Sequence, residues 1–232
     1  NENLTCRILK KRFQKAKVGF FGPFPSTMPE LFNTGDFVLI GEPEYFFMNE
    51  FKDLNQLNGL IKISSLTDLD TLPSPCFNDF PIQTYSYTPS ISEKPFLVLQ
   101  ASKGCPYSCR YYCAYGQNQG SKVRQRSAKK VVNDIVFLKE RYKVKGIQFR
   151  DPTFGISKQF IDEFYKEMKE REVKISWGME TRLDLLNKEN IKQMFEIGLR
   201  NINIGIETIN PEIAIKNKRM LAKKEHQEDL IK

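Results

Sequence analysis

Three cysteines in the middle of this chain have a spacing that suits metal binding. The segment KGCPYSCRYYCAYG, residues 103–116, contains Cys105, Cys109 and Cys113. Thiolates separated by three residues and then three residues can each reach a different iron of an iron–sulfur cube from one tight loop, leaving the fourth iron for a small ligand. The spacing therefore favours a cluster with one exchangeable position.

Zinc, free thiols and a disulfide are the alternatives. Tetrahedral zinc needs a fourth ligand, and the remaining candidates are all distant in the sequence: Cys6, Cys76 and the sole histidine, His226. The chain has five cysteines, and clustered thiols in a reducing compartment are more often metal ligands or redox groups than structural bridges. We rank an iron–sulfur cluster first, then zinc, then unligated thiols, and a disulfide last.

Composition predicts a folded cytoplasmic protein. The chain has 232 residues, of which 40% are hydrophobic, enough for a sizeable core. No run of eighteen apolar residues occurs, and the N-terminal segment is too charged for a signal peptide, so we expect no membrane span. The net charge of +8 suits anionic ligands, but such charge is often only a solvated surface, so nucleic acid is a minority expectation.

Four strands alternate with helices in the second half of the chain. The expected strands are FLVLQAS, GIQF, VKISWGM and NINIGIE. Helix starts are expected at Ser127, Ser157 and Asn187, with Gly198 closing the last helix. The apolar helix faces are expected to be Val131, Ile135, Leu138 and Tyr142, then Phe160, Ile161, Phe164 and Met168, then Ile191, Met194 and Phe195. This alternation predicts a parallel sheet with polar site residues at the carboxyl ends of its strands: Cys105 onward, Asp151, Glu180 to Arg182, and Glu207.

The first part of the chain has a shorter βα rhythm. Between residues 6 and 62 we expect two strands, KVGFF and DFVLIG, a turn at GPFPS, and helices at ILKKRFQKA and PEYFFMNEFKDLNQL. From Leu66 to Pro95 the sequence is rich in Pro, Ser and Asp without a sustained period, which indicates an ordered connecting arm.

Motifs after each of the four later strands resemble the radical S-adenosylmethionine (SAM) superfamily. They are GCPYSCRYYCAYG, RDPTF, TRLD and NIGIET, and the resemblance covers residues 96 to about 220. Upstream, KVGFFGPFP, DFVLIGEPE and LDTLPSP resemble the end of the cobalamin-binding domain and the connecting arm of the subfamily that joins a B12 domain to the radical barrel.

The resemblance implies an α/β fold in three parts. Residues 1–64 correspond to the C-terminal part of a Rossmann-like, B12-binding domain, 65–95 to the arm, and 96–232 to a partial radical SAM (β/α) barrel with about four of its six strands. Strands missing from both domains, and a first residue that is not methionine, suggest a fragment or a truncated gene product. Cobalamin is therefore a possible cofactor of the family that we expect this chain alone to bind weakly or not at all.

The resemblance also assigns roles to single residues. Cys105, Cys109 and Cys113 correspond to the ligands of a 4Fe-4S cluster, although the family's usual spacing is three residues and then two. The residues expected to contact SAM are Tyr112 at the adenine, Asp151, Arg182 at the carboxylate, and Glu207 at the ribose hydroxyls. Each has a structural alternative. Tyr112 could be ordinary packing, Asp151 could open a turn, and Arg182 and Glu207 could form an ion pair with each other.

The implied function is reductive cleavage of SAM to start radical chemistry, methyl transfer or ring formation, on an unknown substrate. Expected partners are a small-molecule or lipid-like substrate and an external low-potential electron donor. A tRNA-modifying enzyme of the methylthiotransferase kind is the enzymatic alternative, favoured by the positive charge. An inactive remnant or a metal-stabilised binding module is the alternative without catalysis.

Overall fold

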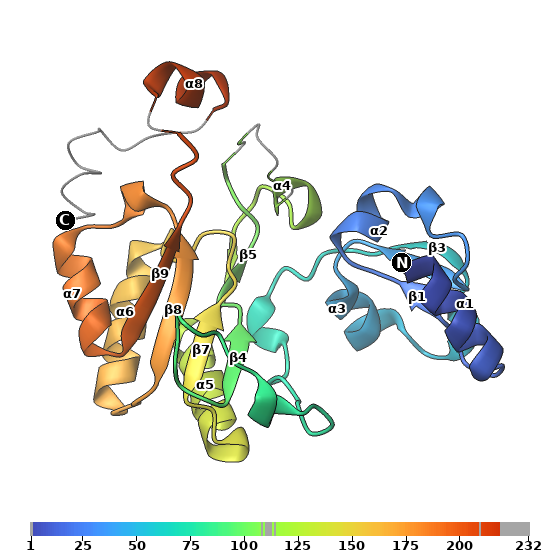
Figure 1. The fold of residues 1–232 in the computed structure, drawn as a ribbon, viewed down its shortest axis with the longest axis horizontal. Coiled ribbons are helices and arrows are strands. Elements are labelled where there is room, and N and C mark those ends of the chain that lie inside the picture. Colours follow the sequence, from blue (N-terminus) through green and yellow to red (C-terminus); the bar gives the residue numbers. More distant parts are fainter. Residues whose placement is uncertain (1, 108, 110–112, 114, 209, 219–232) are drawn as a thin grey trace.

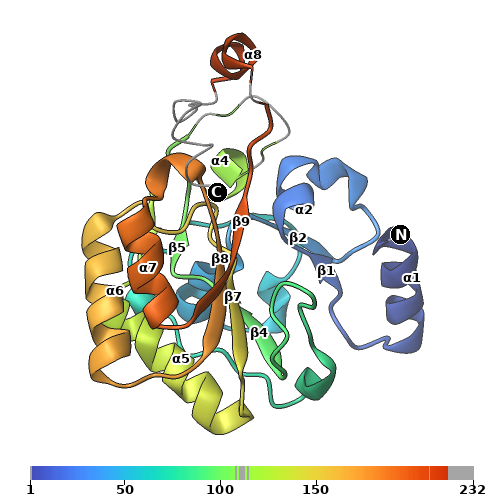
Figure 2. The same cartoon turned by 60° about the vertical axis from the view of Figure 1, so that its left-hand side comes forward.

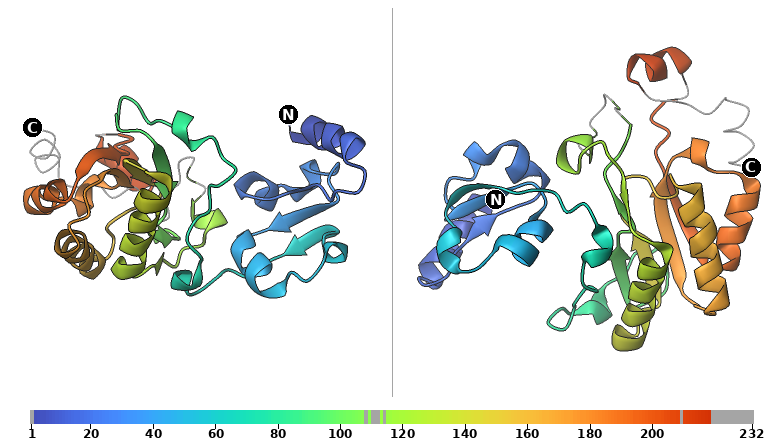
Figure 3. Two further views of the ribbon diagram at one scale, coloured as in Figure 1. Left: turned by 90° about the horizontal axis from the view of Figure 1, so that it is seen from below. Right: turned by 180° about the vertical axis from the view of Figure 1, so that it is seen from behind.

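The computed structural model describes residues 2–107, 109, 113, 115–208 and 210–218. Two α/β units lie side by side, joined by a long connecting arm (Figures 1 and 3). Each unit is built on its own parallel sheet, which confirms the predicted fold class of a Rossmann-like unit followed by a partial (β/α) barrel. Among the described helices, none is long and apolar enough to cross a membrane.

The larger unit is a four-stranded parallel sheet with the order β4-β7-β8-β9. Its strands are β4 (Phe96–Leu99), β7 (Gly146–Phe149), β8 (Ser176–Thr181) and β9 (Leu199–Ile204). The connecting helices are α5 (Ala128–Tyr142), α6 (Lys158–Glu170) and α7 (Lys188–Glu196). These helices lie on one face of the sheet and bury a single large core around Trp177, which is 0% exposed (Figure 2).

The predicted helix starts are confirmed by their capping contacts. The Ser127 hydroxyl accepts a hydrogen bond from the Lys130 amide at 3.2 Å, and the Ser157 hydroxyl accepts one from Phe160 at 3.2 Å. Each bond satisfies an amide that the first helical turn leaves without a partner. The predicted apolar faces of α5 and α6 are buried.

The prediction that Phe195 of α7 points inward was wrong. Met194 is buried, and one residue further turns the side chain about 100° around the helix, so Phe195 is 59% exposed. The Arg200 guanidinium lies over its ring, 4.4 Å from the centroid. Gly198 follows the helix with a φ of 102°, the left-handed conformation expected for a glycine at a helix end.

The smaller unit has three parallel strands, not the two that were predicted. Their order is β1-β2-β3, with β1 (Gly19–Phe20), β2 (Phe37–Ile40) and β3 (Gly59–Lys62). The sequence prediction missed β3, which is only four residues long and mostly exposed, so burial does not impose the alternation of apolar and polar residues that marks a strand. The expected turn at GPFPS is instead the short helix α2 (Pro23–Thr27), since proline suits the first helical turn.

Helices surround this smaller sheet and short turns form the arm. The helices are α1 (Glu2–Arg12) and α3 (Pro43–Tyr45), which runs on into a π-helical turn at Phe46–Glu50. The arm contains 3-10 turns at Leu69–Thr71 and Ile82–Thr84. Its buried side chains, Leu66, Leu69, Ile82 and Ile91, show that the arm is packed rather than free.

A small hairpin, absent from the sequence prediction, brackets the cysteine segment. Strand β5 (Ser102–Lys103) precedes the cysteines and pairs antiparallel with β6 (Arg124–Gln125), which follows them. Helix α4 (Tyr115–Asn118) lies between the two strands in sequence, and α8 (Pro211–Lys216) follows β9 near the end of the described chain. The hairpin closes the base of the cysteine loop.

Candidate active site

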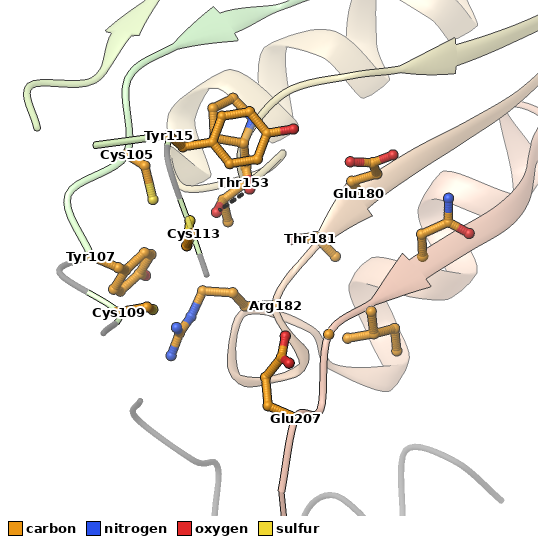
Figure 4. A pocket seen from close by; sticks show the side chains of 14 residues that line it. Cys105, Tyr107, Cys109, Cys113, Tyr115, Thr153, Glu180, Thr181, Arg182 and Glu207 are labelled. Atoms are coloured by element: carbon orange, nitrogen blue, oxygen red, sulfur yellow. Dashed lines mark hydrogen bonds between the residues drawn. The ribbon is translucent and has the colours of Figure 1, made fainter. Parts of the chain in front are cut away.

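A cavity of about 450 Å³ opens at the carboxyl ends of the larger sheet's strands (Figure 4). All four strands contribute the residues that follow them, as expected for a parallel α/β fold. The lining residues are Cys105, Tyr107, Cys109, Cys113, Tyr115, Pro152, Thr153, Glu180, Thr181, Arg182, Asn203, Ile204, Gly205 and Glu207. Five of the seven predicted site residues are therefore gathered around one cavity.

The start of the cysteine loop is held by main-chain hydrogen bonds. The Gly104 amide donates to Gln119 Oε1 at 3.1 Å, and the Cys105 amide donates to the Gly120 carbonyl at 3.1 Å. Gly104 has a φ of 85°, and a Cβ there would lie 2.2 Å from the Lys122 carbonyl oxygen. Only glycine fits this close approach, which fixes where Cys105 enters the cavity.

The three thiols differ in exposure. Cys105 is 7% exposed, Cys109 is half-buried and Cys113 is exposed. Within the described residues, no three Cys, His, Asp or Glu side chains stand close enough to hold a metal ion already. Three thiols on the wall of one cavity are nevertheless the donor set of an iron–sulfur cluster, and they would have to close around it on binding.

The two remaining cysteines lie away from this cavity. Cys6 is buried in α1, and Cys76 is an exposed thiol of the arm that accepts a hydrogen bond from Tyr142 at 3.7 Å. Hydrogen bonds from the Asn78 backbone and from Tyr142 lower the Cys76 pKa. The third candidate for a fourth zinc ligand, His226, lies outside the described residues.

Arg182 lies in the cavity wall between an aromatic ring and a carboxylate. Its guanidinium stacks on Tyr107, 3.9 Å from the ring centroid, and makes two parallel hydrogen bonds to Asp184 at 2.8 and 2.7 Å. Burial opposes the charge, but the hydrogen bonds and charge of Asp184 outweigh it and raise the Arg182 pKa. The bidentate contact orients a permanent cation toward the cavity. Arg182 is thus ion-paired with Asp184, a residue of the turn that follows β8.

Asp151 is fully buried but does not line the cavity. Its carboxylate accepts hydrogen bonds from the Ala101 amide at 3.1 Å and the Ser102 hydroxyl at 2.6 Å. Burial raises its pKa from 3.8 to about 6, against these hydrogen bonds, which lower it. The carboxylate therefore ties the end of β7 to the segment that enters the cysteine loop, and direct contact with SAM stays a prediction.

Of the two remaining predicted SAM contacts, Glu207 lines the cavity and Tyr112 is not described by the structure. Glu207 lines the cavity after β9, with a φ of 63°, and projects toward the same space as Arg182 (Figure 4). Tyr112, the predicted adenine contact, lies outside the described residues. Contact of either residue with SAM stays a prediction.

Sequence reasoning expected site residues from Glu180 to Arg182, and all three line the cavity. Glu180 pairs with Arg150, whose guanidinium lies 5.2 Å from the Tyr87 ring centroid. The Thr181 hydroxyl donates to the Phe154 carbonyl at 2.6 Å, which joins the β7 and β8 loops. Sequence reasoning assigned no role to Thr153 and Asn203, which also line the cavity; their place at the carboxyl ends of β7 and β9 is the signal that could have found them.

The sequence profile of the Radical SAM superfamily matches residues 99–232. This chain belongs to that superfamily. The matched segment contains the whole cavity wall, and membership implies a 4Fe-4S cluster and SAM as cofactors. The chemistry of the three cavity thiols fits such a cluster.

The relatives are methyltransferases and cyclases. An uncharacterized methyltransferase of Pyrococcus horikoshii is 26% identical over 90% of this chain and 49% of its own length. The anaerobic magnesium-protoporphyrin IX monomethyl ester cyclase of Synechocystis is 24% identical over 93% of this chain and 47% of its own. The chain thus spans about half the length of these two relatives.

A solved structure shows the same arrangement of both units. It is the cobalamin-dependent S-adenosylmethionine radical enzyme OxsB with aqua-cobalamin and S-adenosylmethionine bound. The similarity covers 97% of this chain and 36% of that one, with a TM-score of 0.71 and 17% identity. The smaller unit, the arm and the partial barrel therefore share one fold with that enzyme.

Proposed function

We propose that this chain is the cluster-binding part of a radical SAM methyltransferase or cyclase. Cys105, Cys109 and Cys113 would hold the 4Fe-4S cluster, which supplies the electron that cleaves SAM and starts radical chemistry on the substrate. The observation that carries the proposal is that all three thiols line one cavity together with Arg182 and Glu207. Family membership and the methyltransferase and cyclase relatives support the reaction type.

The chain's own residues would bind and orient SAM. Arg182, fixed by Asp184 and stacked on Tyr107, presents positive charge suited to a carboxylate. Glu207, which lines the same cavity after β9, has carboxylate oxygens that can accept hydrogen bonds from hydroxyl groups. Burial raises the pKa of Tyr107 and of Tyr115, two phenols that line the same cavity.

The smaller unit suggests cobalamin as a second cofactor. We infer this from its parallel sheet and from the fold shared with a cobalamin-dependent enzyme. Residues 1–64 would form that unit, 65–95 the arm and 96–232 the radical unit. A small or lipid-like substrate, an external low-potential reductant and a cytoplasmic location complete the proposal.

Anaerobic reconstitution with iron and sulfide tests the proposal. With dithionite and SAM, the reconstituted chain should release 5'-deoxyadenosine and methionine, measured by liquid chromatography. Substitution of any one cavity cysteine by serine should abolish product and lower the iron content, because each thiolate binds its own iron. Cys76→Ser removes an exposed thiol outside the cavity and is the matched control that should retain both. Equal loss in all four variants would contradict the proposal.

A further inference from the structure

Buried charges join the smaller unit to the hairpin that closes the cysteine loop. Glu42, just after β2, is 6% exposed, and its carboxylate accepts two hydrogen bonds from Arg124 of β6, one of them at 3.0 Å. The Lys103 ammonium lies 3.2 Å from the same carboxylate and also pairs with Glu44. One carboxylate of the first unit thus binds a cation from each strand of the hairpin.

Arg124 continues this contact toward the cysteines. Its guanidinium donates to the Leu66 carbonyl at 2.8 Å and to the Gln119 carbonyl at 2.9 Å. The Gln119 side chain accepts from the Gly104 amide, and the next carbonyl, that of Gly120, accepts from the Cys105 amide. Hydrogen bonds, joined through the covalent structure of Gln119 and Gly120, therefore connect Glu42 to the backbone of the first cysteine.

The ion pair between Glu42 and Arg124 is buried, which restricts the movement of both side chains. The Arg124 and Glu42 side chains are 9% and 7% exposed, so neither charge can exchange its partner for water without opening the contact between the units. Removing one partner of such a pair leaves a buried charge without compensation, which is far more costly than losing a surface ion pair. The Arg124 side chain is thereby held in one position, and the carbonyls that it binds are held with it.

We propose that Glu42 and Arg124 are positioning residues that fix the entry of the cysteine loop from the smaller unit. They touch neither cluster nor SAM; they act through Gln119 and Gly120 on the backbone of Cys105. Contacts behind metal ligands commonly set ligand orientation and metal retention. The first unit would therefore influence the cluster site even without a cofactor of its own. The inference rests on the proposed function only for its effect on the cluster.

Amide hydrogen exchange of the metal-free chain tests the positioning directly. In Glu42→Gln, the Gly104 and Cys105 amides should exchange at least about tenfold faster, because their acceptors lose their anchor. The Ile147 amide, in the central strand β7, should keep its rate. Lys10→Gln is the matched control, since the Lys10–Asp36 pair, at 2.9 Å, lies wholly within the smaller unit. Unchanged rates at both loop amides, or an equal rise at Ile147, would overturn the proposal.

A double variant keeps the proposal testable if Glu42→Gln does not fold. Glu42→Gln combined with Arg124→Gln removes both charges at once, so no lone charge stays buried, while Lys103 keeps Glu44. This double variant should fold and still show the faster exchange at both loop amides. Protected loop amides in it would overturn the proposal.

Iron retention measures the effect on the cluster. After reconstitution, the double variant should lose iron to a chelator about tenfold faster than the unmodified chain, as expected when a contact behind a ligand is lost. Equal rates of iron loss would overturn this part of the inference. If the unmodified chain takes up no iron, the proposed function fails, and the exchange experiment still judges the positioning on its own.

Discussion

Replacing Asp151 by asparagine should change how the stability of the chain depends on pH. Asp151 is 0% exposed, and its pKa rises from the ordinary 3.8 to about 6 in the folded chain. Each pKa unit corresponds to about 1.4 kcal/mol, so this difference corresponds to about 3 kcal/mol. Because the folded pKa lies above the unfolded one, the folded chain binds the proton more tightly. The stabilisation is complete below about 3.8 and is lost as the pH rises through about 6.

Asparagine keeps the shape and carries no charge at any pH. The unfolding free energy of Asp151→Asn minus that of the unmodified chain should therefore fall by about 2 kcal/mol between about pH 7.5 and about pH 4, and approach the full value of about 3 kcal/mol only at still lower pH. Urea unfolding of the metal-free chain, followed by circular dichroism, measures both. Glu93 and Glu196, whose pKa values are lowered by hydrogen bonds from Ser176 and Tyr165, lose stabilisation on acidification in both chains, so their contribution cancels.

Ser102→Ala is the control for this prediction. The Ser102 hydroxyl donates to Asp151 and lowers its pKa, so its removal should move the transition to higher pH. A stability difference between Asp151→Asn and the unmodified chain that does not vary with pH would refute the reasoning. It would mean that Asp151 has the same pKa in the folded and the unfolded chain.

Three further predictions concern the loop and the smaller unit. Gly104→Ala places a Cβ 2.2 Å from the Lys122 carbonyl oxygen at a φ of 85°, so it should lower the free energy of unfolding in urea by about 1–3 kcal/mol. Gly116→Ala is the control: its Cβ would meet nothing within 4 Å, so the loss of stability should be much smaller. Deleting Tyr111 or Tyr112 restores the family's usual cysteine spacing and should raise iron content or the yield of 5'-deoxyadenosine; loss of the cluster would show that the longer loop is the working geometry. Titration with hydroxocobalamin should give weak or no binding to this chain, because the three-stranded sheet encloses only a small core; stoichiometric micromolar binding would contradict this.

Periodicity and capping residues predicted most of the larger unit. Ser127 and Ser157 gave the starts of α5 and α6, and four apolar segments gave the parallel sheet. These features are local, since a cap or a helical repeat is complete within a few residues. The apolar signal failed at β3, which is nearly all exposed, and at Phe195, one position beyond the buried stripe.

Contacts between distant segments could not be predicted from the sequence. Nothing in the pattern around Glu42 indicates that Arg124, 82 residues later, binds it. The cysteines were found from their spacing and Arg182 from its place directly after a strand, and the rule of strand ends says where a residue lies but not which group it binds. The rule placed Asp151 at the correct strand end and could not show that its carboxylate turns to Ser102.

Electron paramagnetic resonance of the reconstituted, dithionite-reduced chain tests the central claim most directly. Three loop thiolates with no fourth cysteine or histidine close to them in the sequence predict about four irons per chain and one iron open to SAM. The reduced cluster should therefore show a signal that shifts when SAM is added, and Cys76→Ser should show the same shift. One stoichiometric zinc with no iron uptake, or a cluster signal that SAM leaves unchanged, would contradict the account.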